Sequence, residues 1–434
     1  MPFRNGMASL FRGGTVLNRA TPFVIFVPMP VQLSREQLIQ TAKDFGTPLY
    51  VYYAERIKEQ YDKLLTAFNG SDVKFFYAAK ALTNINILRY IKDIGCNIDC
   101  SSINEAKLAA RAEFIPQNIL YTSNNIAFEE IEEAQGMGIH INIDSISNLR
   151  KFGKKFGHSY PVGIRLRPNI MAGGNLKIST GHAESKFGVP LEDIAEVLKV
   201  QKETGLFIRT LHIHTGSEIK DVEVFAKGIE VLFEAAQYFP DLEVIDLGGG
   251  FKVPYMPGEE GTDIELLGKK VKEEFEWYEK KYGRHLQVWF EPGKFLVSDA
   301  GYLITKVNVL KQSGDIAFAG VDSGLNHFIR PMFYGAYHEI ENISNPSGEK
   351  RKYNVVGNIC ETDTFAENRL LPEIREGDHL VFRNAGAYGF EMASNYNSRF
   401  KPAELLIKKG TLHLIRKREV MEDLLKNQTN LPES

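Results

Sequence analysis

Several features that would mark a special class of protein are scarce in this 434-residue sequence. Its three cysteines, Cys96, Cys100 and Cys360, are too few for a disulfide framework and indicate a reducing compartment. No apolar run approaches the roughly 20 residues that a membrane-spanning helix needs. A net charge of −3 gives no basic field for nucleic acid or an anionic membrane. What remains is an ordinary globular composition, 43% hydrophobic and 25% charged, long enough for two large domains.

The first 30 residues are the one segment that could be read as a targeting sequence. They contain arginines and the short apolar run "FVIFVPM". Prolines interrupt the run, and no small-residue cleavage site follows it. We therefore expect residues 1–30 to be a disordered leader, with Met29 as an alternative start, and the protein to be cytoplasmic.

Short apolar runs alternate with amphipathic helical patterns in the first two thirds of the chain. The expected strands are 73–79, 97–102, 119–124, 140–145, 162–168, 208–217, 244–251 and 287–293. Eight strands, each followed by a helix, predict a parallel (β/α)₈ barrel of the TIM type, of about 250 residues.

After residue 300 the pattern changes, because strand candidates follow one another without long helices. This pattern predicts a C-terminal antiparallel β-domain. We place the barrel at 61–300 and the β-domain at 301–434. Residues 31–60 contain one helix and one strand, and we expect part of this segment to pack with the β-domain.

Reactive residue types collect where the expected barrel strands end. They are Lys80 after the first strand, His214 and Ser217 after the sixth, Gly248, Gly249 and Gly250 after the seventh, and Glu291 and Gly293 after the eighth. In a parallel barrel the active site is built at this face, where the loops after the strands converge. Their joint placement is stronger evidence for a site than any one of them.

Each of these features also has a purely structural interpretation. Lys80 could extend from the strand end to solvent, His214 could be a core histidine, and "DLGGGF" could be only a tight turn. A lysine held among apolar groups, by contrast, has a lowered pKa and can form a Schiff base. We predict no metal site, expecting the two histidines of "HIHTGS" to point to opposite faces of their strand.

The glycines and the carboxylate indicate a cofactor. Consecutive glycines expose backbone N–H groups that can bind a phosphate, and the hydroxyl of Ser217 can add to them. Glu291 follows the apolar run "VWF", so its carboxylate should be partly buried and needs a cationic partner. A Schiff-base lysine, a phosphate site and a carboxylate for a protonated ring nitrogen predict pyridoxal 5′-phosphate, with His214 stacked on its ring.

Eight motifs link the chain to a known family. They are "FFYAAKAL", "STGHAESKFG", "LHIHTGS", "DLGGGF", "EPGKFLV", "RPMFY", "CETD" and "GAYGFEMASNYNSRFKPAE". In order and spacing they resemble the fold-type III pyridoxal-phosphate decarboxylases, and most closely the diaminopimelate decarboxylases, from about residue 45 to 410. The resemblance implies an alanine-racemase-like barrel with a C-terminal β-domain that carries substrate and dimer contacts, in a head-to-tail homodimer.

The resemblance also implies roles for individual residues. Lys294, Arg330, Tyr334, Glu361 and Tyr388 are expected to hold the substrate. Tyr388 should lie near the cofactor phosphate as well. Cys360 resembles the catalytic cysteine of the family, which enters the site of the partner subunit; without the motif it would be interpreted as an inert thiol.

The chain departs from the family pattern in two motifs. Lys294 stands where the family usually has the arginine of "EPGR", and a lysine lacks the planar fork that binds a carboxylate through two hydrogen bonds. The "CETD" motif is one residue shorter than the usual "CESGD". This shortening leaves the place of Asp363 open, whereas Cys360 and Glu361 align.

The resemblance implies decarboxylation of meso-2,6-diaminopimelate to L-lysine and CO₂, the last step of lysine biosynthesis. Carboxynorspermidine, ornithine or arginine decarboxylases are alternatives, and an alanine-racemase-like activity fits the C-terminal motifs less well. A pyridoxal-phosphate-binding regulator without catalysis is a further alternative. It would need none of Lys80, Glu291 and Cys360, and all three are present.

Overall fold

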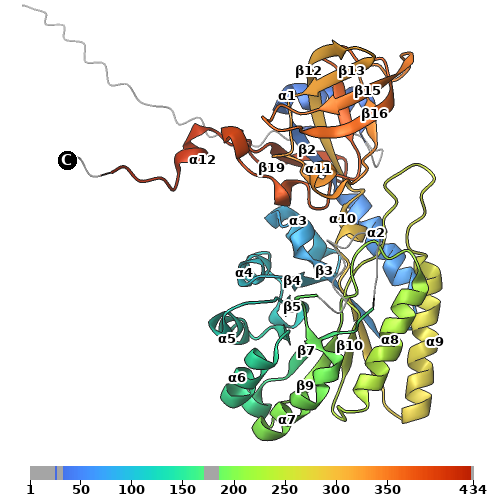
Figure 1. Ribbon diagram of the computed structural model, residues 1–434, viewed down its shortest axis with the longest axis vertical. Coiled ribbons are helices and arrows are strands. Elements are labelled where there is room, and N and C mark those ends of the chain that lie inside the picture. Colours follow the sequence, from blue (N-terminus) through green and yellow to red (C-terminus); the bar gives the residue numbers. More distant parts are fainter. Residues whose placement is uncertain (1–24, 27–32, 171–184, 432–434) are drawn as a thin grey trace, which may run out of the picture.

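The computed structural model describes residues 25–26, 33–170 and 185–431 and consists of a barrel and a β-domain (Figure 1). Eight parallel strands close the barrel in the order β6-β5-β4-β3-β11-β10-β9-β7, and β7 pairs back to β6. They are β3 (Val73–Ala78), β4 (Asn97–Cys100), β5 (Ile119–Thr122), β6 (His140–Ile143), β7 (Val162–Arg167), β9 (Ile208–His212), β10 (Val244–Asp246) and β11 (Gln287–Phe290). Each predicted strand is present, and the predicted fold class is confirmed.

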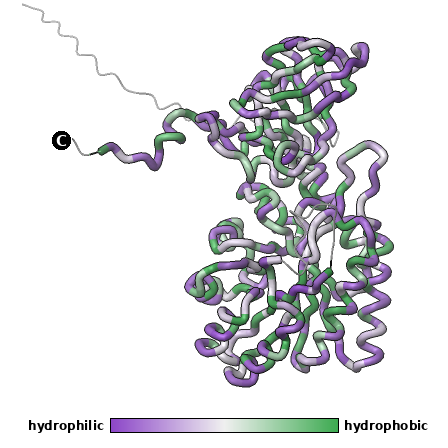
Figure 2. The backbone as a smooth tube through the Cα atoms, in the orientation of Figure 1, coloured by the Kyte–Doolittle hydropathy of each residue, from purple (hydrophilic) through white to green (hydrophobic). Residues whose placement is uncertain are grey.

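Amphipathic helices surround the barrel, and hydrophilic and hydrophobic residues alternate along them (Figure 2). They are α2 (Ala54–Ala67), α3 (Ile85–Asp93), α4 (Ile103–Arg111), α5 (Phe128–Gly136), α6 (Ile146–Phe156), α7 (Ile194–Thr204), α8 (Val222–Ala236) and α9 (Ile264–Tyr282). Their ends follow local chemistry. Asp263, for example, begins α9 by accepting a hydrogen bond from the Leu266 N–H at 2.9 Å, and Gly283 ends it at φ +64°.

One helix differs from the sequence prediction. The last strand, β11, is followed only by the four-residue helix α10 (Lys294–Val297), not by a full-length helix. The eighth helix of the ring is instead α2, which precedes the first strand and contacts both α9 and α3. Sequence periodicity identifies helices but not their neighbours in a closed ring. The prediction that every strand is followed by its own helix is therefore wrong for the last strand.

The β-domain is a single mixed sheet. Its strands are β1 (Ile25–Phe26), β2 (Leu49–Tyr53), β12 (Gly301–Ser313), β13 (Ile316–Val321), β14 (Ile340–Asn342), β15 (Lys350–Val356), β16 (Thr364–Pro372), β17 (His379–Phe382), β18 (Ala403–Lys408) and β19 (Thr411–Arg416). Most pairings are antiparallel, but β2 runs parallel to β18, and β13 runs parallel to β15.

The N-terminal segment supplies the centre of this sheet. Strand β2 is completely buried between β12 and β18, and helix α1 (Arg35–Phe45) packs buried residues on the same cluster. The short elements β8 (Val189–Pro190), α11 (Arg330–Tyr334) and α12 (Met421–Leu425) complete the described chain. Of the expected leader, only β1 is described, paired with β19; the rest of residues 1–30 lies outside the described residues.

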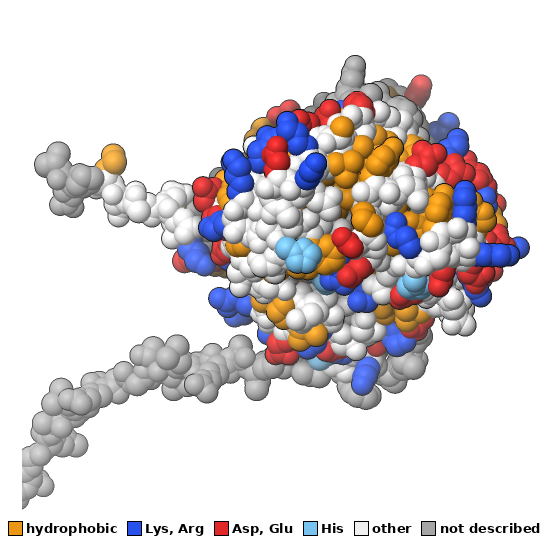
Figure 3. Space-filling model, turned by 90° about the horizontal axis from the view of Figure 1, so that it is seen from below, with side chains coloured by type: hydrophobic (Ala, Val, Ile, Leu, Met, Phe, Trp, Pro, Cys, Tyr) orange, Lys and Arg blue, Asp and Glu red, His pale blue; other side chains and the backbone are white. Residues whose placement is uncertain are grey.

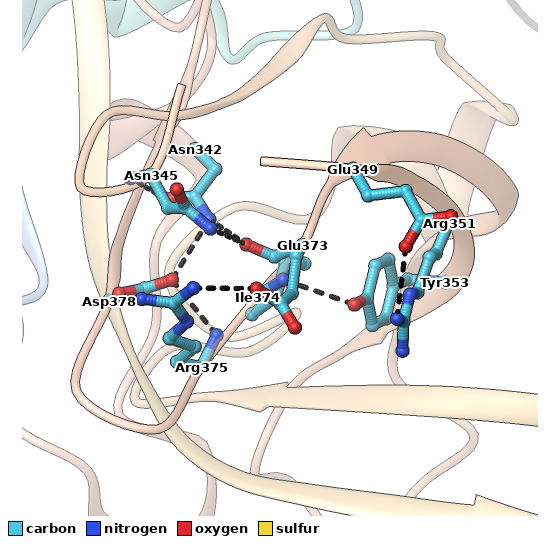
Figure 4. A network of polar contacts seen from close by, with 9 residues as sticks. All are labelled: Asn342, Asn345, Glu349, Arg351, Tyr353, Glu373, Ile374, Arg375 and Asp378. Atoms are coloured by element: carbon cyan, nitrogen blue, oxygen red, sulfur yellow. Dashed lines mark hydrogen bonds and ion pairs between the residues drawn. The ribbon is translucent and has the colours of Figure 1, made fainter. Parts of the chain in front are cut away.

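A polar network fixes one end of the β-domain (Figure 4). The side-chain amide of Asn342 donates to the Glu373 carbonyl and to Asp378 Oδ2, both at 2.9 Å. The amide of Asn345 donates to the same carbonyl at 2.9 Å. These bonds tie the end of β14 to the end of β16 and the start of β17. They anchor β16, which begins directly after the loop 357–363 that carries Cys360.

The end of the barrel remote from the β-domain carries no continuous field of one charge on its described face. Acidic and basic side chains are interspersed there around apolar ones (Figure 3). Within the described ranges, no helix is long and apolar enough to cross a membrane.

Candidate active site

A cavity of about 700 Å³ lies at the carboxyl ends of the barrel strands, beside the β-domain. The predicted residues that line it are Lys80, His214, Ser217, Glu291, Lys294, Arg330, Tyr334 and Tyr388. A smaller pocket of about 50 Å³ adjoins it and is lined by Gly249, Gly250 and Gly293 together with several of the same residues. Residues more than 300 positions apart in the chain therefore meet in one site.

Lys80 lies in a single 3₁₀ turn (Ala79–Ala81) directly after β3. Its Nζ is 3.8 Å from Asp99 Oδ2 and 3.4 Å from Ser101 Oγ. Burial lowers the pKa of Lys80, but its electrostatic interactions with Asp99, Tyr388 and Glu291 outweigh burial, and the pKa is raised. The lowered pKa predicted from the apolar strand is therefore wrong for this state, since the neighbouring carboxyl groups were not considered.

Glu291 follows β11 and is 6% exposed. Its Oε1 lies 3.3 Å from Nε2 of the fully buried His212. Burial raises the pKa of Glu291, but His212, Lys80 and His214 lower it to about 2, so the carboxylate remains ionised. Burial lowers the pKa of His214 to about 3, which keeps that ring neutral.

The two histidines of "HIHTGS" face the same side of the barrel wall. His212 contacts Glu291, and His214 lines the cavity above it. The prediction that they point to opposite faces is wrong, because residues two apart in an extended strand share a face. His212, Asp246 and Glu291 place ligand atoms within 4.8 Å of one another. All three residues are buried, and Oδ1 of Asp246 accepts the Gly248 N–H at 3.0 Å.

Buried charged groups beneath Glu291 were missed in the sequence. Asp99, Arg165 and Asp246 end their strands or lie within them and are at most 6% exposed. Burial first, and then the charge of Glu291, raise the pKa of Asp99 and of Asp246 well above the usual range. Burial and the Glu291 charge thus both favour the protonated form of Asp246, whereas Asp99 also faces the Lys80 amine, which lowers its pKa. The available signal was a charged residue inside an apolar strand, as in "NIDCSS", "GIRLRP" and "VIDLGGG".

The glycine turn after β10 fits closely against its neighbours. A Cβ at Gly249 would lie 2.3 Å from the Glu291 carbonyl oxygen, and Gly248 and Gly250 have φ of +67° and +109°. The Gly249 N–H donates to Nδ1 of His214 at 3.2 Å. Side chains are thus excluded here, and the backbone of this turn borders the small pocket directly. Gly248 itself borders neither cavity but shapes the turn.

Arg330, at the start of α11, lies in the wall of the large cavity. It is 7% exposed, and its guanidinium lies 5.5 to 5.9 Å from the ring centres of Tyr255, Tyr334 and Tyr388. Its Nε has no hydrogen-bond partner among the described residues. The Tyr388 N–H donates to the Ala81 carbonyl at 2.9 Å, which ties this wall to the Lys80 turn. A desolvated guanidinium on aromatic faces suits an incoming carboxylate.

Cys360 and Glu361 do not line the cavity of their own chain. Both are exposed in the loop between β15 and β16. Asn397 Nδ2 lies 2.9 Å from Cys360 Sγ, and the Tyr396 hydroxyl donates to Glu361 at 2.7 Å. Asp363 is buried, and its carboxylate accepts the backbone N–H groups of residues 325 and 359 at 2.6 and 2.9 Å, so it anchors the shortened motif.

The residues present fit pyridoxal phosphate. Glu291 lines both cavities and its carboxylate is ionised, as suits a partner for a cationic ring nitrogen. The small pocket between Ser217 and the glycines offers room for a phosphate. Lys80 lines both cavities, and Arg330 lines the large one.

Comparisons with known proteins agree with this geometry. Residues 54–298 match the family described as pyridoxal-dependent decarboxylase, pyridoxal binding domain. A diaminopimelate decarboxylase of Methanothermobacter thermautotrophicus is 40% identical over 91% of this chain and 94% of its own length. That of Escherichia coli K12 is 33% identical over 91% of this chain and 96% of its own length.

Solved structures give the same result. The chain superimposes on diaminopimelate decarboxylase of Helicobacter pylori, complexed with L-lysine, with a TM-score of 0.82, 33% identity and coverage of 90% of this chain and 98% of that one. The enzyme from M. jannaschii gives a TM-score of 0.84, with 31% identity and coverage of 91% and 94%. This chain therefore belongs to the diaminopimelate decarboxylase family of pyridoxal-dependent decarboxylases.

Proposed function

We propose that this chain converts meso-2,6-diaminopimelate to L-lysine and CO₂, the last step of lysine biosynthesis, with pyridoxal 5′-phosphate held on Lys80. One observation carries the proposal: the cavity is lined by a lysine and an ionised carboxylate that follow barrel strands and by a buried arginine of the β-domain. Such a cavity suits an amino acid whose distal end carries a second carboxylate.

Each residue has a role set by its position. Bound pyridoxal phosphate would supply a sink for the electron pair that stays on the α-carbon when CO₂ leaves. Lys80 provides the amine for covalent attachment, and the ionised Glu291 holds the proton on the ring nitrogen that it faces. The neutral ring of His214 offers a flat surface to pack against. Cys360 or Lys80 returns a proton to the α-carbon of the substrate.

The distal end of the substrate meets Arg330, Tyr334, Tyr388 and Lys294 in the same chain. Arg330 pairs with the distal carboxylate, since a guanidinium binds a carboxylate through two hydrogen bonds. Glu361 pairs with the distal amine. It reaches the substrate from a second copy of the chain, because in its own chain it lies outside the cavity.

The protein therefore acts as a homodimer with shared sites. The exposed positions of Cys360 and Glu361, next to Tyr396 and Asn397, support this arrangement. Three unpaired thiols support a reducing compartment, which we infer to be the cytoplasm.

A panel of amino acids tests the function. Ornithine and lysine lack the second carboxylate, so their binding leaves Arg330 unpaired in a desolvated wall, at a cost of about 3 to 5 kcal/mol. We expect kcat/KM for meso-diaminopimelate to exceed that for ornithine, lysine and arginine by at least ~100-fold, measured as CO₂ release. Arg330→Ala should narrow the gap by losing diaminopimelate activity. A wild-type preference for ornithine or arginine would overturn the substrate assignment.

Glu291→Gln should reduce kcat by about 100- to 1,000-fold. The amide is neutral, so it no longer stabilises a proton on the facing ring nitrogen, although its size is retained. Steady-state kinetics and cofactor content of the purified variant measure the effect, and we expect cofactor content to change little. Glu196→Gln, which breaks a surface pair with Arg150, is the matched control. An unchanged kcat in Glu291→Gln would exclude the proposed role.

A further inference from the structure

An ion pair between Glu218 and Lys294 lies in the wall of the cavity. The two residues are 76 positions apart, one in the loop after β9 and the other at the start of α10. Lys294 is 9% exposed, and Glu218 is 24% exposed. The pair is thus a partly desolvated contact, unlike the exposed ion pairs on the outer helices.

Lys294 lies where the two cavities meet. It lines the small pocket together with Ser217 and Gly250, and it lines the large cavity together with Arg330. An anionic group in either cavity, a phosphate or a carboxylate, would therefore approach its amine. This is also the position at which the family usually has arginine.

The backbone directs Glu218 toward Lys294. Glu218 has φ +62°, a left-handed conformation that is unfavourable for a residue with a Cβ. The next residue, Ile219, donates its N–H to the Gly250 carbonyl at 2.9 Å, which holds the loop against the glycine turn. The neighbouring lysines Lys220 and Lys252 pair with other glutamates, not with Glu218.

The charge of Lys294 depends on its surroundings. Titratable groups line both cavities with it: Lys80, His214, Glu291 and Tyr388 line both, and Asp99, Arg165, Glu218, Tyr255, Glu259, Arg330, Tyr334 and Tyr337 line the large one only. Burial first, and then Arg330, lower the pKa of Lys294 to about 7. The Glu218 carboxylate in contact with the amine opposes both effects, so removing it would lower the pKa of Lys294 further.

We propose that Glu218 is a positioning residue that holds the Lys294 amine at the junction of the two cavities and favours its ammonium form, so that Lys294 can bind an anionic oxygen group. The group is either the phosphate of the cofactor or a carboxylate of the substrate. Glu218 thereby moves this lysine toward the charge that an arginine would have by itself. Only the substrate part rests on the proposed function.

The test compares Glu218→Gln with wild type and with the double variant Glu218→Gln/Lys294→Arg. Holoenzyme is dialysed against graded pyridoxal phosphate to obtain its dissociation constant, and KM for meso-diaminopimelate is measured separately, each from about pH 6 to about pH 9. Glu260→Gln, which removes the exposed partner of Lys220, is the matched control. Circular dichroism verifies that each variant is folded.

In Glu218→Gln, affinity for the anionic group is expected to match wild type at low pH. In wild type the affinity should fall above about pH 7, where Lys294 loses its proton, and in Glu218→Gln the fall should begin at a lower pH, because no carboxylate opposes the effect of burial on the Lys294 pKa. In the double variant this pH dependence should disappear, since arginine stays charged. A change only in the dissociation constant of pyridoxal phosphate would identify the cofactor phosphate as the group that Lys294 binds. A change only in KM would identify the substrate carboxylate.

Two results would overturn the inference. One is a pH profile of Glu218→Gln that falls at the same pH as that of wild type in both measurements. The other is a double variant as sensitive to pH as Glu218→Gln. A wild-type protein that does not turn over diaminopimelate would instead refute the proposed function, while the cofactor measurement would still test the ion pair.

Discussion

Lys80→Ala is expected to reduce turnover of diaminopimelate by at least about a thousandfold, because Lys294, the other lysine that lines both cavities among the described residues, is already paired with Glu218. The variant should also lack the absorbance band near ~420 nm that borohydride removes, a general property of lysine-bound pyridoxal phosphate. Activity and absorption spectra of the purified variant measure both effects. The barrel should still fold, since the Lys80 side chain is 44% exposed to the cavity.

Lys74→Ala is the matched control for this experiment. Lys74 lies on the same strand, β3, but is exposed and packs its amine over the Trp289 ring at 5.9 Å. We expect this variant to retain its colour and turnover. Full activity and borohydride-sensitive colour in Lys80→Ala would show that another residue holds the cofactor.

The main elements of the site could be predicted because a parallel barrel brings its strand ends together. Lys80 and Glu291 belong to the first and last strands, which become neighbours when β3 pairs with β11. A prediction that both follow strands therefore places them side by side without any knowledge of packing. The glycine turn after β10 is positioned by the same rule.

The electrostatics of the site could not be predicted in this way. The raised pKa of Lys80 depends on Asp99, and the raised pKa of Asp246 depends first on its burial and then on Glu291. These are contacts between strands, and the sequence does not show which side chains of two strands point at each other. The Glu218–Lys294 pair has the same origin, because a loop and a short helix from different strands meet only in the folded chain.

The central position of β2 was also beyond sequence patterns. Its run "LYVYY" identifies a buried strand, but its neighbours β12 and β18 lie about 250 and 350 residues further along the chain. Register between such distant segments depends on packing of the whole sheet rather than on local propensity. The same limit explains why α2, rather than a helix after β11, closes the ring.

The shared site of the dimer leads to the second large effect. Cys360→Ala and Lys80→Ala should each be nearly inactive as pure homodimers. When the two are mixed and reassociated, half of the dimers become mixed. In each mixed dimer one site combines an intact Lys80 with an intact Cys360 from the other chain. Activity should therefore recover to about a quarter of the wild-type value.

A second mixture provides the matched control. Lys80→Ala combined with Glu291→Gln should recover no activity, because Lys80 and Glu291 line the cavity of the same chain. Every site in those mixed dimers then lacks one of the two residues. The contrast between the two mixtures distinguishes true sharing from an unspecific gain on reassociation.

The position of Cys360 makes this experiment decisive. The cysteine is exposed, lies outside the cavity of its own chain and is held by Asn397 on a loop that Asp363 anchors. If it acted within its own chain, loop 357–363 would have to leave these contacts. Both mixtures would then remain inactive even though mixed dimers had formed. If Cys360→Ala alone kept normal turnover, the thiol would be dispensable, and Lys80 would be the group that returns the proton to the α-carbon.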